Sequence, residues 1–379
     1  MPNDVSVRPA ARHRSAAALL RGLPLADGRV AIFAALVAVL GLGAGLARTI
    51  ALEQTRDWTV YEQAAARLVE GKPLYLDRAA TTDGLYLYPP AAAALWAVVG
   101  SPEALLAAKL ALLCMVGTLA LVVTSSAASR LTRWLVAAAL IVVAVAAPPE
   151  LHDFALGNVM AFYIGAVALS VAVPGWLGAV PLGVVCAVAL KPVIGPYLLW
   201  LFISRRSDAV RVAITGLAVS VVVAAAIGPE RYVEYLSALP GMSSMFHQSG
   251  GNIGLSAVAA PLAVVGLIVA YVGTVFASRR LSLHSSAAVA IAAGLLAQPT
   301  LGFNYLGLLI PAAALLWSNA PRAGLAAIVV LPPLAIVSAP LAAALVMVLA
   351  FATPGGRPGP LAGAQAAAVG TTFDPAPSG

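Results

Sequence analysis

The sequence predicts an all-α, polytopic membrane protein, and three observations indicate this class. Of its 379 residues, 61% are hydrophobic and only 10% are charged, and the mean hydropathy is +0.95. This composition excludes an ordinary soluble globular domain. Apolar runs long enough to cross a bilayer, which takes about 20 helical residues, recur between residues 30 and 351. The arginines stand in short clusters between these runs, so the net charge of +7 indicates membrane topology rather than a nucleic-acid partner.

Three segments divide the chain. Residues 1–29 carry several arginines and are predicted to be cytoplasmic, because positive charge beside a first span stays inside. Residues 30–351 form the membrane domain, and residues 352–379, rich in Pro, Gly and Ala, form a disordered cytoplasmic tail. The first apolar run lacks a small-residue cleavage pattern, so it is a retained helix rather than a signal peptide. Residues 57–100 then form the first extracytoplasmic loop.

The spans follow when the arginine clusters are held in the cytoplasm. Crossings are expected at 30–51, 103–124, 134–147, 155–173, 210–227, 255–277, 287–297 and 305–317. The first of these runs outward and the direction then alternates, except that 176–203 leaves and returns between two of them. The chain also lacks an internal repeat at a fixed period, which weakens a transporter built of duplicated halves.

Prolines mark the places that depart from simple spans. Residues 88–99 are too short to cross and begin with two prolines, which predicts an interfacial or half-inserted helix. Lys191-Pro192 lies near the middle of 176–203 and predicts a helical hairpin or a broken helix there. Pro332, Pro333 and Pro340 interrupt the last apolar block. The total is roughly nine to twelve crossings at about 20 residues each.

Nearly all polar motifs without a topogenic role fall on the extracytoplasmic face of this topology. They lie in segments 56–62, 86–88, 150–158, 230–252 and 298–305. A proton- or ion-coupled carrier would place acids inside its spans, whereas Asp and Glu here stand in loops and at helix ends. The distribution therefore favours a site that converts a lipid-borne substrate at the membrane surface. A non-catalytic lipid-carrier transporter or scaffold is the alternative.

Asp57 opens the most polar segment of the chain, directly after the first apolar run. A charge at the membrane boundary is costly to bury and usually has a function there. A carboxylate partly withdrawn from water accepts a proton more readily, so Asp57 is the candidate general base. The alternative is structural, because Asp57 also suits a pair with Arg56 or a cap on a helix that begins near Thr59. The residues alone do not decide between the two.

Three cationic side chains are candidates for binding a phosphate leaving group, namely Lys191, Arg231 and His247. Lys191 lies in an apolar stretch, and snorkelling to the interface is its alternative. Arg231 equally suits a salt bridge to Glu230 or Glu234. His247 stands in a loop whose glycines permit close backbone approach to a ligand, although a lone histidine in a loop is more often simply solvated.

The sequence predicts no metal site and no cofactor. His152 and Asp153 are adjacent, and two ligands do not make a metal site. Cys114 and Cys186 both lie in apolar runs without metal-ligand spacing, so they are expected to be small buried side chains.

A series of motifs follows in order along the chain. It starts with Asp57, Val60-Tyr61, paired alanines, Gly71 and Leu74-Tyr75, and continues with Tyr86-Leu87-Tyr88-Pro89-Pro90, Leu156-Gly157-Asn158, Leu190-Lys191-Pro192, His247-Gln248-Ser249 with Asn252, and Pro299 to Tyr305. Together these resemble the glycosyltransferases of the GT-C superfamily, specifically family 87. That family includes the polyprenol-phosphate-mannose-dependent α-mannosyltransferases of mycobacteria. The resemblance covers roughly residues 50 to 310.

The sequence departs from the family pattern at two places. The family usually has Gly-Gln before the asparagine, whereas Leu156-Gly157 precede Asn158 here. It also usually has a histidine near the position of Asn304 or Tyr305.

The resemblance implies a GT-C-type bundle with a catalytic first extracytoplasmic loop. It implies an inverting enzyme that transfers mannose from polyprenyl-phosphate-mannose to a glycolipid or lipoglycan and forms an α-mannoside outside the cell membrane. Asp57 is then the catalytic base, and Lys191, Arg231 and His247 bind the donor phosphate. The implied substrate-binding residues are Tyr61, Tyr88, Asn158, Gln248, Asn252, Asn304 and Tyr305.

Two points of this interpretation stay open. Tyr61 and Tyr88 suit stacking against a sugar, but they also suit the aromatic belt at a membrane interface, which is the commoner role. Related enzymes use polyprenyl-phosphate-arabinofuranose, and no residue here decides between the two sugars. The implied partners are the lipid-phosphate donor, the acceptor and membrane lipids, with no cofactor and no nucleic acid.

Overall fold

The computed structural model describes the segments 56–75, 86–99, 158–246, 253–255, 259–298, 303–319 and 338–352, and the single positions 109, 116, 119, 137, 140, 301 and 327. Every regular element in these segments is a helix, and the described residues contain no strand. The predicted all-α class is therefore confirmed for this part of the chain. The predicted N-terminal segment, the first three spans and the C-terminal tail lie wholly or almost wholly outside the described residues.

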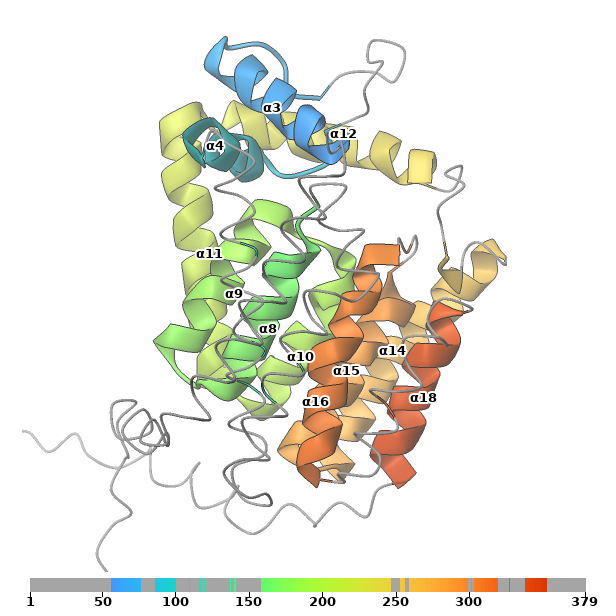
Figure 1. The fold of residues 1–379 in the computed structure, drawn as a ribbon. Coiled ribbons are helices and arrows are strands. Elements are labelled where there is room, and N and C mark those ends of the chain that lie inside the picture. The colour runs from blue at the N-terminus through green and yellow to red at the C-terminus, as the bar shows by residue number, and fades with distance from the viewer. Residues whose placement is uncertain are drawn as a thin grey trace, which may run out of the picture.

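Most of the described helices run side by side in one bundle (Figure 1). Its centre is α15 (Leu283–Ala297), in which every residue from Ser285 onward is buried. The other members are α8 (Met160–Ala172), α9 (Trp176–Ala189), α10 (Gly195–Ser204), α11 (Arg206–Ile227), α14 (Ala260–Arg280), α16 (Leu309–Asn319) and α18 (Ala339–Ala352). Helices α10, α14, α16 and α18 all pack against α15.

Three helices, α3 (Arg56–Val69), α4 (Pro90–Val99) and α12 (Glu230–Phe246), lie across one end of the bundle, here called the capped end (Figure 1). Helix α3 packs on α4, and α4 packs on α9 and α11. The short helix predicted after the two prolines is α4, which begins at the second of them because proline fits the first turn of a helix.

Helix α11 and residues Pro261–Arg280 of α14 are long and apolar enough to cross a membrane. Both turn large apolar side chains outward, which a core helix of a soluble protein would bury. The exposed side chains include Leu217, Val221 and Val222 on α11 and Val264, Ile268 and Val272 on α14. The predicted spans at 210–227 and 255–277 correspond to these two helices.

The predicted break in 176–203 is confirmed as a helical hairpin. Helix α9 ends at Ala189, and α10 returns after the short 3₁₀ turn η2 (Pro192–Ile194). Lys191 between them has an extended backbone, with φ −126° and ψ 139°, as expected for a residue before proline. The hairpin tip therefore carries Lys191 outside a regular helix.

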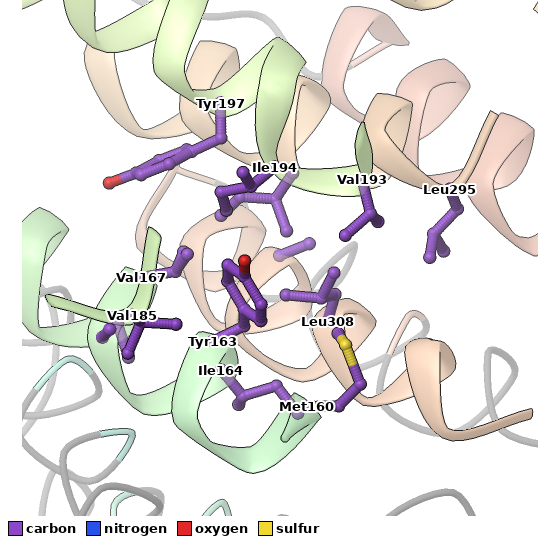
Figure 2. Packing of buried hydrophobic residues seen from close by; sticks show 14 of the residues in the cluster. Met160, Tyr163, Ile164, Val167, Val185, Val193, Ile194, Tyr197, Leu295 and Leu308 are labelled. Carbon is purple, nitrogen blue, oxygen red and sulfur yellow. The ribbon is translucent and has the colours of Figure 1, made fainter. Parts of the chain in front are cut away.

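The hairpin tip is held against α15 and α8 by close packing (Figure 2). Val193 N–H donates to Gln298 Oε1 at 3.1 Å, and a side chain at Gly294 of α15 would collide with the Val193 carbonyl. The Tyr163 hydroxyl of α8 donates to the Ala189 carbonyl at the end of α9. These contacts fix the backbone on both sides of Lys191.

The opposite end of the bundle is tied by Asp208 in the first turn of α11. Its carboxylate accepts from Gly175 N–H at 3.0 Å and pairs with Arg211 at 2.6 Å and with Arg205 at 2.5 Å. Arg205 also donates to the Ser170 carbonyl of α8 at 2.8 Å. Gly175 has φ +97°, a conformation that favours glycine, and so its N–H can turn toward Asp208. Lys191 and Arg205 flank opposite ends of α10, so the length of that helix separates them.

Candidate functional site

Lys191 brings together four of the sequence-predicted site residues, because three others contact its ammonium group. Its Nζ donates to Asn158 Oδ1 at 3.2 Å. It also lies 5.2 Å from the ring centroid of Tyr88 and 4.8 Å from that of Tyr305. Both distances fall in the range of cation–π attraction. The snorkelling alternative for Lys191 is thus not what the structure shows, since its charged end has specific partners within the protein.

Each of these residues comes from a different segment, and each stands at a helix end or a helix break. Lys191 precedes η2, and Asn158 stands two residues before α8. Tyr88 directly precedes the proline pair that starts α4, and Tyr305 lies in the 3₁₀ turn η3 (Phe303–Leu308). The Asn158 carbonyl oxygen also accepts from Val159 N–H at 2.7 Å, which orients it toward Lys191. Helix ends at one side of the bundle therefore build the site.

The electrostatics of this cluster favour an anion. The partners of the half-buried Lys191 are an amide and two aromatic rings, all of them neutral. Among the described residues, no carboxylate lies within ion-pair distance of it. A partly desolvated positive charge without a counter-ion attracts a phosphate or another anionic group strongly. The arrangement can therefore bind a phosphate and offset charge that develops on it.

Tyr61 of α3 contacts Tyr88, which in turn contacts Lys191. Its ring meets Tyr88 edge-on at 5.2 Å and stacks on Trp96 of α4 at 5.3 Å, and Trp58 lies 5.6 Å from the same indole. The Tyr61 side chain is only 1% exposed. In the structure it therefore packs and positions Tyr88, and it does not present an open face for a sugar.

Two further tyrosines fix the segment that carries Tyr88. The Tyr75 hydroxyl donates to the Tyr88 carbonyl at 2.8 Å. The Tyr86 hydroxyl donates to the Pro89 carbonyl at 2.7 Å and accepts from Ala93 N–H at 2.8 Å. Burial first, and then neighbouring tyrosines, raise the pKa of Tyr75 and Tyr86 above the ordinary value, and Glu234 also contributes at Tyr75. Both therefore stay neutral hydroxyl donors at physiological pH.

Asp57 is the second residue of α3 and precedes Tyr61 by four residues. The helix begins at Arg56, three residues before the predicted start at Thr59, so Asp57 lies inside the first turn. The side chain of Asp57 lies outside the described part of the structure. Its predicted role as the base stays a prediction.

Arg231 takes part in the ion pair that the sequence offered as its alternative role. Its Nη1 lies 3.2 Å from Glu234 Oε2, and its Nη2 donates to the Gly71 carbonyl at 2.8 Å. Glu234 Oε1 in turn accepts from Leu74 N–H at 2.7 Å and from Tyr75 N–H at 3.0 Å. Arg231 and Glu234 thus dock the loop after α3 onto α12, and neither is among the partners of Lys191.

The remaining predicted residues divide into two groups. His247, Gln248 and Asn252 lie outside the described residues. Asn304 directly precedes Tyr305 in η3, and it is buried, with 3% of its surface exposed. Within the described ranges, no group of three His, Cys, Asp or Glu side chains is arranged to hold a metal ion.

Sequence reasoning missed two polar residues that the structure marks. Lys109 is 1% exposed and lies in the apolar run 103–124, where a lysine among apolar residues was the available signal. Gln298 is 8% exposed and binds the backbone of the hairpin tip. Its position at the start of the polar segment 298–305 did not indicate that it binds the backbone of Val193.

No protein-family model matches the sequence, and neither a curated protein nor a solved structure matches it.

Proposed function

We propose that this chain is a multi-pass membrane glycosyltransferase of the inverting type. It transfers mannose from polyprenyl-phosphate-mannose to a glycolipid or lipoglycan acceptor on the extracytoplasmic face of the cell membrane, and the product is an α-mannoside. The observation that carries the proposal is the Lys191 cluster, in which an ammonium without a described counter-ion is held by Asn158, Tyr88 and Tyr305 at the capped end of an apolar bundle.

The cluster suits the leaving group of such a reaction. A polyprenyl donor keeps its lipid tail in the bilayer and its phosphate at the headgroup level. Lys191 stands at a helix break at the end of the bundle, beside helices with exposed apolar faces. When the bond from the sugar to the phosphate oxygen breaks, the phosphate takes the electron pair, and a preorganised cation offsets that charge.

Asp57 supplies the base in this mechanism. Residues four apart share one face of a helix, and Tyr61, four residues after Asp57, contacts Tyr88 of the cluster. The acceptor hydroxyl gives its proton to Asp57 while its oxygen forms the new bond to the anomeric carbon, opposite the departing phosphate. A single displacement inverts the configuration, so one carboxylate suffices for a β-linked donor to give an α-linked product.

The sidedness follows from charge. Arg205, Arg206, Arg279 and Arg280 lie at the end of the bundle remote from Lys191, and clusters of arginine beside spans stay in the cytoplasm. The Lys191 cluster then faces outside the cell, where a polyprenyl-phosphate donor replaces nucleotide sugars. Arabinofuranose in place of mannose is the variant of this proposal that the same cluster serves equally.

The test is transfer of radiolabelled mannose from polyprenyl-phosphate-mannose to endogenous glycolipids in membranes that contain the protein. Wild type and three variants are compared at equal amounts of folded protein: Asp57→Asn, Lys191→Met, and Glu62→Gln as a matched control. Glu62 is an exposed acid on the same helix as Asp57. We expect wild type and Glu62→Gln to transfer label, and we expect each of the other two variants to lose about a hundredfold or more.

The outcomes separate the parts of the proposal. Transfer by Asp57→Asn at the wild-type rate removes the base assignment, and transfer by Lys191→Met removes the phosphate role. If wild type transfers no mannose but does transfer arabinofuranose from its polyprenyl phosphate, the sugar is corrected. If neither donor serves, the transferase proposal is wrong.

A further inference from the structure

Five arginines gather at the end of the bundle opposite the capped end, here called the arginine end: Arg205, Arg206, Arg211, Arg279 and Arg280. Arg205 and Arg211 both pair with the Asp208 carboxylate. Arg206, Arg279 and Arg280 are exposed, and no carboxylate among the described residues lies within ion-pair distance of them. Three guanidinium groups at this end are therefore available to an external anion.

The ends of α10 and α14 place these arginines at the same level of the bundle. A side chain at Gly195, the first residue of α10, would collide with the Tyr271 hydroxyl of α14, and each helix continues for nine residues beyond that point. Trp200 of α10 donates to Ser286 Oγ at 2.9 Å, just after α14 has ended at Arg280. The two helices thus run in the same direction with equal rise, and they end level with one another.

Phenylalanine rings lie directly beneath two of the arginines. The Arg206 guanidinium carbon is 5.8 Å from the Phe202 ring centroid, and that of Arg280 is 5.5 Å from the Phe276 centroid. Phe276 also lies 5.7 Å from Phe351 of α18. Phe202 is 57% exposed and Phe276 is 51% exposed, so each arginine stands above an open aromatic face.

Apolar surface continues from these rings along the bundle. The exposed side of α14 below Phe276 carries Val272, Ile268 and Val264. A ligand that fits the whole feature has an anionic group for the guanidiniums and an apolar chain for the surface beneath. A free phosphate ion would contact only the guanidinium groups, and a nucleic acid has no apolar chain to cover the apolar surface.

We propose that Arg206, Arg279 and Arg280 form a binding site for the headgroup of an anionic phospholipid, whose acyl chains lie along α14. Guanidiniums bind phosphate oxygens in forked pairs, and their stacking on Phe202 and Phe276 holds them at the level where headgroup and acyl chain meet. The site depends on α11 and α14 lying in a bilayer, and it does not depend on the transferase proposal.

The test is native mass spectrometry of the full chain in detergent, titrated with phosphatidylglycerol and with phosphatidylcholine of the same acyl chains. The variant carries Arg206→Gln, Arg279→Gln and Arg280→Gln together. Lys72→Gln, which removes an exposed cation at the capped end, is the control. We expect saturable preference for phosphatidylglycerol in wild type and control, and at least about a tenfold loss of that preference in the triple variant, because each cation near a membrane surface contributes roughly fivefold.

Several results would overturn the proposal. They are an unchanged preference in the triple variant, binding that does not saturate, and displacement by inorganic phosphate as readily as by phosphatidylglycerol. If the triple variant does not fold, a photoactivatable phosphatidylglycerol on the wild type decides. Cross-links in residues 202–211 and 264–280 support the site, and cross-links elsewhere contradict it.

Discussion

Glu234 offers the sharpest test of how the capped end is held together, and the perturbation is Glu234→Ala. Its carboxylate accepts two backbone N–H groups, from Leu74 at 2.7 Å and Tyr75 at 3.0 Å, and pairs with Arg231. Leu74 is 0% exposed, so its N–H finds no water partner when the carboxylate is removed. An unsatisfied buried donor costs about 1–3 kcal/mol. The amide of Tyr75, which is half-exposed, adds a smaller loss. We therefore expect the free energy needed to open the loop after α3 to fall by about 2–4 kcal/mol.

Hydrogen exchange measured by mass spectrometry reports this opening directly. A loss of 2–4 kcal/mol accelerates exchange of the Leu74 and Tyr75 amides by about thirty- to several-hundredfold. Peptides from α15 serve as an internal reference, because that helix is buried from Ser285 onward. Glu230→Ala is the matched control, since Glu230 is an exposed acid on the same helix. Exchange of the two amides at the wild-type rate in Glu234→Ala would refute the docking role.

Three more substitutions test other contacts. Asp208→Asn leaves the nearly buried Arg205 and the partly exposed Arg211 without their counter-charge. Thermal unfolding in detergent should show a loss of about 3 kcal/mol, chiefly from Arg205; an unchanged midpoint contradicts the role of Asp208 in joining the helix ends. Gly294→Ala forces a methyl group against the Val193 backbone and should cost about 1–3 kcal/mol of stability in the same assay. The control Gly273→Ala meets only the flexible end of a methionine and should cost less. Equal losses in the two variants would refute the close packing of the hairpin tip on α15. Tyr75→Phe removes one hydrogen bond and should cost about 1 kcal/mol, and no loss would show that this bond does not hold the Tyr88 segment.

The helical architecture was largely readable from the sequence because apolar run length and proline position are local signals. The break at Lys191-Pro192, the short α4 after its two prolines and the long α11 and α14 all followed from such signals. Helix boundaries were less accurate. The span predicted at 210–227 begins at Arg206 in the structure, because its first turn includes charged residues that a hydropathy criterion leaves out.

The partners of charged residues were not readable in the same way. The sequence offered Arg231 both a phosphate and two glutamates, and the choice of Glu234 depends on where the loop after α3 meets α12. That meeting joins residues about 160 positions apart, which no local pattern encodes. Likewise, only the family resemblance indicated that Tyr88, Asn158, Tyr305 and Lys191 belong to one site. Their positions in the sequence do not show that the first three contact Lys191.

The location of polar residues at helix breaks gives the strongest reason to regard the Lys191 cluster as functional. In a bilayer, a break exposes backbone groups that a regular helix would satisfy, so breaks persist only where protein or water provides partners. Here Lys191, Asn158, Tyr88 and Tyr305 all stand at helix ends or breaks, and the other three contact Lys191. Arg231, in contrast, already pairs with Glu234 and donates to the Gly71 carbonyl, and Glu234 also accepts two backbone N–H groups. A cation that joins several breaks and has no described counter-ion is thus a better candidate for binding an anionic substrate than one already held by a carboxylate.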